Sequence, residues 1–345
     1  MLRRTKNRIA LLAVMALTLT GVSACNSSDT AGSPSDKSGP SVVKVGWIPS
    51  VNFIALLETI DQWKDPDSKI ELVEFKSSAD TLVAINQGAV DIATVGYSVV
   101  ADGMSKVEMP LEYIAGVSTK GAFLVAGKDS GISTWEDLKG KKVGGVRGSP
   151  EYLHLAGSME AHGIKIGKDA EFVNFQSGSD IILALQKGDI DAAVSYEPLV
   201  AAAVQNGSVV RLPEMQKTLM DQTFELSSGV LARTAFVDKN TAWTVSFLKA
   251  YSENVDAFAV DPKPEEAAKT YLKYSAGDPA VVADAIGYIT AVYDLDEEQV
   301  RRVGKTLLSS GQLKKDMAQV LVDHLDYGPL SKATGKTAEQ LGKSE

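Results

Sequence analysis

A short segment, residues 147–150, follows an apolar strand pattern and contains residues suited to bind a small molecule. Ser149 precedes Pro150 and a helical pattern, so its hydroxyl and the free N–H groups of that helix could hold a sulfonate, phosphate or carboxylate. Arg147 could add a bidentate contact to the same anion. The alternatives are a helix cap without a ligand for Ser149 and a surface position for Arg147. The segment predicts anion binding.

Aromatic and acidic residues in other loops could complete such a site. Phe53, Tyr97 and Tyr196 offer flat walls, and the tyrosines add polar tips, although each ring could instead pack in the core beneath its loop. Glu197 and Glu225 are candidates to pair with a cationic group of the ligand. The alternative for both is an exposed surface carboxylate.

The remaining reactive residue types give little support for catalysis. His154 and His162 are eight residues apart, which is not the i, i+4 spacing of a helical zinc pair. The glycine-rich stretch 144–149 lacks the spacing of a dinucleotide fingerprint and of a P-loop. We see no triad or metal cluster, and therefore expect a binding protein that is not an enzyme and uses no metal or cofactor.

An internal repeat predicts the elements that position these residues. Segments 74–98 and 174–198 share seven identities over 25 ungapped positions, at an offset of 100. Each copy reads as strand, helix and strand, with a serine that caps the helix, an aspartate three residues later, and a glycine that ends it. The identical pairs are Phe75 and Phe175, Ser77 and Ser177, Asp80 and Asp180, Ala84 and Ala184, Gly88 and Gly188, Asp91 and Asp191, and Ala93 and Ala193.

Strands at Val43–Gly46 and Lys142–Gly144 open the two copies, so each forms a β-α-β-α-β unit with a mostly parallel sheet. We predict an α/β protein of two similar doubly wound lobes. Strands at 122–126 and 226–236 are expected to cross between the lobes, and helices over 240–342 to pack on the first lobe. The predicted first lobe comprises residues 42–125 plus 226–345, and the second comprises residues 126–225.

The N-terminal region predicts export and lipidation. Residues 1–24 read as a signal peptide, with four basic residues before an apolar run, 9–19, that is too short to span a bilayer comfortably. Cys25 follows Val-Ser-Ala, which resembles the bacterial lipobox, where the thiol receives a diacylglycerol; the alternative is a buried free thiol. Residues 25–41, rich in Ser, Asp, Gly and Pro, are expected to form a flexible tether.

The charge excludes one class of partner. The whole chain carries −9, and without the +4 of the signal peptide the mature part carries −13. An acidic protein without a Lys/Arg block is a poor binder of nucleic acid, so we expect none.

Four segments carry a resemblance to a known family. The chain resembles the solute-binding proteins of ABC importers, and in particular the family that binds taurine, alkanesulfonates, nitrate and pyrimidine vitamin precursors. The resemblance covers residues 42–236. The segments are VKVGWIPSVNFIALL, ELVEFKSSADTLVAINQGAVDIATVG, GISTWEDLKGKKVGGVRGS and ALQKGDIDAAVSYEP.

The resemblance implies ligand contacts in the loops at strand ends. Relatives that bind taurine often carry an acidic residue where this chain has Asn52, and the residue before the Glu-Pro pair is Tyr196 where many relatives have Trp. Glu197 stands where many have a small apolar residue. The expected ligand-binding residues are Asn52, Phe53, Tyr97, Ser98, Ser149, Tyr196, Glu197 and Glu225.

The resemblance also implies the biological role. We expect a monomeric receptor, lipid-anchored through Cys25 on the outer side of the cell membrane, that captures a small anionic or zwitterionic molecule such as a sulfonate or taurine. It would deliver this ligand to a permease and its ATPase. The alternatives are nitrate or a pyrimidine precursor as ligand, an enzyme on the same fold, and a sensory lobe of a receptor.

Overall fold

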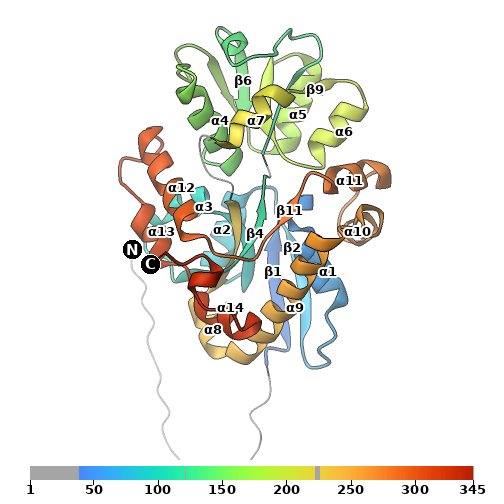
Figure 1. Cartoon of the computed structure of the whole chain (residues 1–345), viewed down its shortest axis with the longest axis vertical. Coiled ribbons are helices and arrows are strands. Elements are labelled where there is room, and N and C mark those ends of the chain that lie inside the picture. Colours follow the sequence, from blue (N-terminus) through green and yellow to red (C-terminus); the bar gives the residue numbers. More distant parts are fainter. Residues whose placement is uncertain (1–38, 121, 222–225, 345) are drawn as a thin grey trace, which may run out of the picture. The chain divides into compact units, whose positions relative to one another are not determined.

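A six-stranded mixed sheet organises the first lobe of the computed structural model, which describes residues 39–120, 122–221 and 226–344 (Figure 1). The strand order is β11-β4-β10-β3-β1-β2, with β2, β1 and β3 parallel and β10 antiparallel to both β3 and β4. The strands are β1 (Val42–Trp47), β2 (Lys69–Glu74), β3 (Ile92–Gly96), β4 (Leu111–Thr119), β10 (Leu226–Arg233) and β11 (Thr290–Ala291).

A five-stranded sheet in the order β7-β6-β8-β5-β9 organises the second lobe. Its strands are β5 (Phe123–Gly127), β6 (Lys142–Gly145), β7 (Glu171–Asn174), β8 (Ala192–Ser195) and β9 (Val209–Arg211). β7, β6 and β8 are parallel and β5 is antiparallel to β8, so β7-β6-β8-β5 repeats the arrangement of β2-β1-β3-β10. The predicted α/β class with two similar sheets is confirmed.

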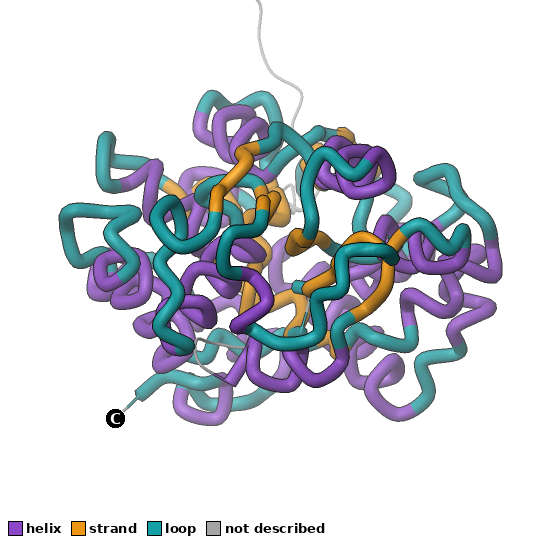
Figure 2. Tube along the Cα trace, turned by 90° about the horizontal axis from the view of Figure 1, so that it is seen from above, coloured by secondary structure: helices purple, strands orange, loops and turns teal. Residues whose placement is uncertain are grey.

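Helices cover the sheets, and in the view from above they lie around the strands (Figure 2). The first lobe contains η1 (Val51–Phe53), α1 (Ile54–Gln62), α2 (Ser78–Asn86) and α3 (Tyr97–Met104). The second contains η2 (Glu136–Leu138), α4 (Pro150–Ala161), α5 (Gly178–Lys187), α6 (Leu199–Gln205) and α7 (Pro213–Asp221).

The C-terminal part is helical, as predicted, and packs mainly on the first sheet. Trp243 and Phe247 of α9, for example, share one buried cluster with Trp47 of β1 and Ile54 of α1. The elements are α8 (Thr234–Lys239), α9 (Thr241–Val260), α10 (Pro264–Tyr271), α11 (Pro279–Ile286), α12 (Glu297–Ser309), α13 (Ala318–Asp323), α14 (Tyr327–Thr334) and η3 (Glu339–Leu341).

The repeated residues have equivalent structural roles in the two lobes. Ser77 and Ser177 cap α2 and α5, each accepting a hydrogen bond from the backbone N–H three residues later at 3.2 Å. Gly88 and Gly188, with φ of +75° and +74°, follow the two helices in the left-handed region that favours glycine. The repeat therefore encodes the fold of each lobe and not a catalytic group.

The repeated aspartates join neighbouring strands in the same way. Asp91 accepts a hydrogen bond from the backbone N–H of Lys44 at 3.0 Å, and Asp191 accepts one from that of Lys142 at 2.8 Å. Asp91 therefore ties the start of β3 to β1, and Asp191 ties the start of β8 to β6. In the first lobe Asp91 also forms an ion pair with Arg233 of β10.

The predicted crossing strands require a correction. The strand predicted at 122–126 is β5, which pairs with β8 and β9 of the second sheet, so the expected boundary between residues 125 and 126 falls inside it. β10 ends at Arg233, and Thr234 to Phe236 begin α8. An apolar run marks a buried strand, but its partners in a sheet depend on residues far away in the sequence.

Several predicted features lie outside the described residues. These are the signal peptide, Cys25, most of the tether and the candidate ligand contact Glu225. Within the described ranges, no helix combines the length and the apolar character needed to cross a membrane.

Candidate ligand-binding cleft

A cavity of about 50 Å³ lies between the two lobes. Most of its lining follows the carboxyl ends of β1, β2, β6, β7 and β8, where ligands bind in open α/β sheets. Wider spaces of about 530 and 180 Å³ share Ser77 and Gln176 with it, so the cavity is the inner part of a longer cleft. The lining residues are Ile48, Ser50, Asn52, Phe53, Lys76, Ser77, Ser78, Val146, Ser149, Pro150, Glu151, Gln176, Ser177, Gly178, Tyr196 and Ser228.

Three helix N-termini converge on this cavity. Their capping residues, Ser77 of α2, Ser149 of α4 and Ser177 of α5, all line it. Each serine accepts a backbone hydrogen bond with its Oγ. The hydroxyls of Ser77 and Ser177 donate to the carboxylates of Asp80 and Asp180, at 2.8 and 2.7 Å, so the groups free to meet a ligand are the backbone N–H groups of the first turns. The exposed Lys76, just before the cap of α2, adds a positive charge. Helix N-termini and an ammonium group together favour an anion.

Ser149 is a helix cap, and it also borders the cavity. Its Oγ accepts a hydrogen bond from the N–H of Tyr152 at 3.2 Å. Asn52 and Phe53 line the cavity from the first lobe, and both side chains are buried. The Oδ1 atom of Asn52 has no hydrogen-bond partner among the described residues.

Tyr196 forms the aromatic wall of the cavity on the second lobe. Its ring lies against Gly178 at the start of α5, where a Cβ atom would come within 2.8 Å of a ring carbon. The absence of a side chain at Gly178 therefore allows the ring to cover the N-terminus of the helix. Burial raises the pKa of the Tyr196 hydroxyl, and the nearby charge of Glu151 raises it further.

Glu151 is one of several cavity residues that the sequence interpretation missed, with Ser50, Lys76 and Gln176 among the others. It lies in the first turn of α4 and is partly buried in the cavity wall. Burial raises the pKa of its carboxyl group, and hydrogen bonds from its own backbone N–H and from the Ser149 hydroxyl oppose this rise. An acidic residue in a first helical turn is common because it complements the helix dipole, so no local pattern distinguishes Glu151 as a cavity residue.

Tyr97 and Ser98 do not line the cavity. Both are buried at the start of α3, where the ring of Tyr97 packs against that of Tyr113 with centroids 4.3 Å apart. The Ser98 hydroxyl donates a hydrogen bond to the carbonyl oxygen of Gly148 at 2.9 Å. This bond joins the first lobe to the second, so Ser98 contributes to the contact between the lobes.

Glu197 does not line the cavity either. Its side chain is fully buried, forms an ion pair with Arg211 and accepts a hydrogen bond from the N–H of Ala201 at 2.8 Å. Burial raises the pKa of the carboxyl group, and the Arg211 guanidinium opposes this rise. The Glu197 carbonyl oxygen accepts hydrogen bonds from the Ser50 hydroxyl at 3.1 Å and the Val51 N–H at 3.3 Å. Glu197 thus supports the contact between the lobes.

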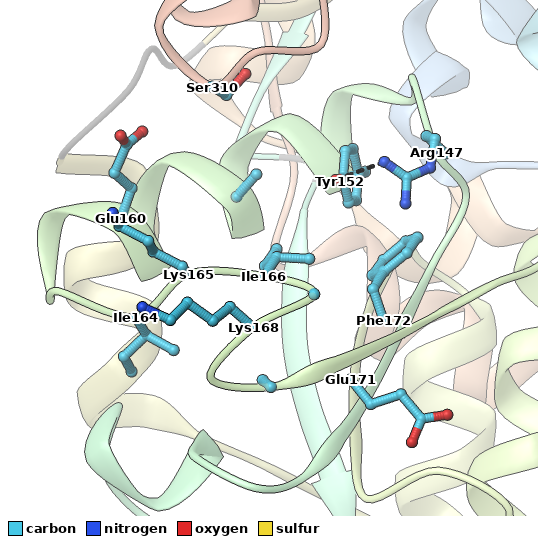
Figure 3. Close-up of a pocket in the computed structure, with 13 residues that line it drawn as sticks. Arg147, Tyr152, Glu160, Ile164, Lys165, Ile166, Lys168, Glu171, Phe172 and Ser310 are labelled. Atoms are coloured by element: carbon cyan, nitrogen blue, oxygen red, sulfur yellow. Dashed lines mark hydrogen bonds between the residues drawn. The ribbon is translucent and has the colours of Figure 1, made fainter.

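Arg147 lies beside a separate groove, which has a volume of about 690 Å³ (Figure 3). Its guanidinium carbon lies 5.4 Å from the ring centroid of Tyr152 and 4.9 Å from that of Phe172. It also donates a hydrogen bond to the Tyr152 hydroxyl at 3.3 Å. These contacts hold the cation away from the inner cavity, although Arg147 does line the outer space of 180 Å³.

The chain is similar in sequence to a known family and to two named binding proteins. The model of the NMT1-like family matches residues 36–272. Two proteins of Escherichia coli (strain K12) are similar in sequence. One, named for binding aliphatic sulfonates, is 27% identical over 71% of this chain and 75% of its own length. The other, the taurine-binding periplasmic protein, is 26% identical over 76% of this chain and 82% of its own length.

A solved structure is similar in fold. The alkanesulfonate-binding protein SsuA from Xanthomonas axonopodis pv. citri, bound to MOPS, superimposes with a TM-score of 0.69 at 17% identity. The match covers 84% of this chain and 99% of the other. At this level of identity the likeness establishes the fold, which is that of periplasmic binding proteins.

Proposed function

This chain belongs to the NMT1-like family, and we propose that it is the solute-binding component of an ABC importer. Its ligand would be a small anionic or zwitterionic molecule of the sulfonate or taurine kind. The observation that carries the proposal is the convergence of three serine-capped helix N-termini on one cavity between the lobes. The relatives named for sulfonates and taurine support the ligand class.

Contacts from both lobes explain how binding would be transmitted to a permease. We propose that Asn52 and Phe53 of the first lobe and Ser149 and Tyr196 of the second contact the ligand, since all four line the cavity. A ligand held by both lobes favours their closure, and a permease can recognise the closed form. Glu225 stays a proposed contact outside the described residues.

The proposed location follows from the N-terminus. Lipidation of Cys25 would hold a monomeric receptor on the outer side of the cell membrane, close to its permease. Incorporation of a labelled fatty acid into the wild-type protein, and its loss in C25S, would support this proposal. Equal labelling of both proteins, or of neither, would contradict it.

The ligand proposal is tested by thermal unfolding of the purified protein with taurine, an alkanesulfonate, nitrate and a pyrimidine precursor. A ligand at 100 times its Kd stabilises the folded state by about 2.7 kcal/mol, so a sulfonate should raise the melting temperature measurably. E160Q is the matched control because Glu160 is an exposed acid of α4 that lines neither the inner cavity nor the spaces of 530 and 180 Å³, so this variant should leave the shift intact. A shift with nitrate or the pyrimidine alone, or with none of the four, would overturn the sulfonate assignment.

A further inference from the structure

Three side chains join the two lobes outside the inner cavity. Tyr288 belongs to the first lobe, between α11 and β11, whereas Phe123 of β5 and Arg211 of β9 belong to the second sheet. The ring centroids of Tyr288 and Phe123 are 5.8 Å apart in an edge-to-face arrangement, and the Arg211 guanidinium carbon lies 4.2 Å from the centroid of Tyr288. None of the three lines the inner cavity or the spaces of 530 and 180 Å³, so a ligand there would not touch this contact.

Arg211 connects this contact to the edge of the cavity. Its guanidinium forms the ion pair with Glu197, whose carbonyl oxygen accepts hydrogen bonds from the Ser50 hydroxyl and the Val51 N–H of the first lobe. Ser50 lines the cavity. The two second-lobe residues therefore meet the first lobe at two places, at the cavity edge and at Tyr288. Separation of the lobes on this side must break both contacts.

Buried packing on the same side makes the ring of Tyr288 removable without loss of the fold. Ala201 of α6, whose N–H donates to the Glu197 carboxylate, is a buried second-lobe residue in the apolar cluster of the first lobe. Tyr288 is instead 43% exposed and is not part of that cluster. A variant without this ring should therefore fold and lose only the contact between the lobes.

We propose that Tyr288 is a positioning residue that favours the closed arrangement of the lobes, and that it thereby increases ligand affinity without contacting the ligand. A cation over a ring and an edge-to-face ring pair both attract, and here each joins one lobe to the other. A contact made only when the lobes meet raises the population of the arrangement that binds the ligand from both sides. The effect on affinity rests on the proposed function, whereas the effect on the lobes does not.

The first test uses no ligand. Hydrogen exchange of the purified full-length protein, followed by mass spectrometry, reports the peptide that contains the Val51 N–H, whose acceptor is the Glu197 carbonyl. Y288A should speed this exchange about fivefold, the effect of losing one cation–ring and one ring–ring contact, because the lobes separate more often. Y288F keeps the ring and should exchange as the wild type does.

Y274A is the matched control because Tyr274 is a half-buried tyrosine of the first lobe. It bonds to Asp61 and packs on the first-lobe cluster, so its loss should leave the exchange at Val51 unchanged. Melting curves establish that each variant folds. Unchanged exchange in Y288A, or an equal increase in Y274A, would overturn the role of Tyr288.

The second test measures affinity with two probes, taurine and propane-1-sulfonate, by stopped-flow tryptophan fluorescence. For a probe that binds the wild type, Y288A should release it about fivefold faster and change the association rate less, since most changes in affinity appear in dissociation. An unchanged dissociation rate would overturn the effect on affinity. If the wild type bound neither probe, the proposed sulfonate function would fail, and the exchange at Val51 would still decide whether Tyr288 holds the lobes together.

Discussion

The variant R211M, which lacks the Arg211 guanidinium, is expected to be less stable than the wild type by about 3 kcal/mol, because the Glu197 carboxylate stays buried without its cation. Breaking a buried ion pair on one side costs about 3–5 kcal/mol. The Glu197 side chain is 0% exposed, but that of Arg211 is 21% exposed, so water reaches the pair and the lower end of this range applies. The loss includes contacts of the guanidinium with Tyr288 and Phe123, at 4.2 and 5.2 Å from the ring centroids, worth about 0.5–1 kcal/mol each.

A double-mutant cycle measures the interaction free energy between Glu197 and Arg211 apart from the contacts of Arg211 with the two rings. E197Q removes the charge but keeps the shape, and the Ala201 N–H still finds an acceptor, so we expect a loss of about 1–2 kcal/mol. In E197Q/R211M no buried charge remains, and the loss should be smaller than the sum of the single losses by about 1–2 kcal/mol. Urea unfolding followed by circular dichroism and tryptophan fluorescence gives the four free energies.

The pH dependence gives an independent check with a defined sign. Burial already raises the pKa of Glu197 in the folded protein, and loss of Arg211 should raise it further. A folded protein that binds more protons than the unfolded chain loses stability as pH rises through that window. The deficit of R211M should therefore shrink as pH falls from neutral toward the ordinary glutamate pKa, about 4.3.

Two results would refute this reasoning. Additive losses in the double mutant would show that Glu197 and Arg211 do not interact, and a deficit in R211M that stays constant with pH would show that an uncompensated charge is not its cause. The same variants also test the original interpretation of Glu197 as a ligand contact. A folded E197Q that no longer responds to any ligand of the wild type would restore that interpretation.

Two further predictions concern stability and the cavity wall. Burial raises the pKa of both Glu58 and Glu112 to about 7, so their folded carboxyl groups retain protons that the unfolded chain releases above about pH 4.5. The free energy of unfolding should therefore fall as pH rises from about 4.5 to about 7, and the double variant E58Q/E112Q should flatten this slope in urea unfolding at several pH values; an unchanged slope would contradict the assignment. G178A places a Cβ atom 2.8 Å from a ring carbon of Tyr196 and should displace that ring, so titration should show weaker binding of the ligand that stabilises the wild type. Unchanged affinity in G178A would show that the position of the ring is not important for binding.

The fold was largely predictable because its main signals are local or repeated. The caps at Ser77 and Ser177 act on N–H groups three residues away, and Gly88 and Gly188 adopt the left-handed conformation for which glycine is suited. The repeat indicated that two units share one topology, which the matching strand orders confirm. The sheet to which β5 belongs was not predictable, because strand partners come from distant parts of the chain.

The cavity was predictable only in part. Asn52, Phe53, Ser149 and Tyr196 were expected in strand-end loops, and all four line it. Glu151 was missed, because whether an acid in a first helical turn meets water or a cavity depends on what the other lobe places opposite it.

The sequence by itself determined the α/β class, the paired lobes, the helix caps and the loops from which binding residues come, because each of these depends on residue types at short spacing. Only the tertiary structure decided which side chains in those loops face the cavity. Ser98 meets Gly148 across 50 residues of chain, and the Glu197 carbonyl meets the Ser50 hydroxyl across 147. Such contacts exist only when the lobes come together, so no local pattern distinguishes a residue that joins the lobes from one that binds the ligand.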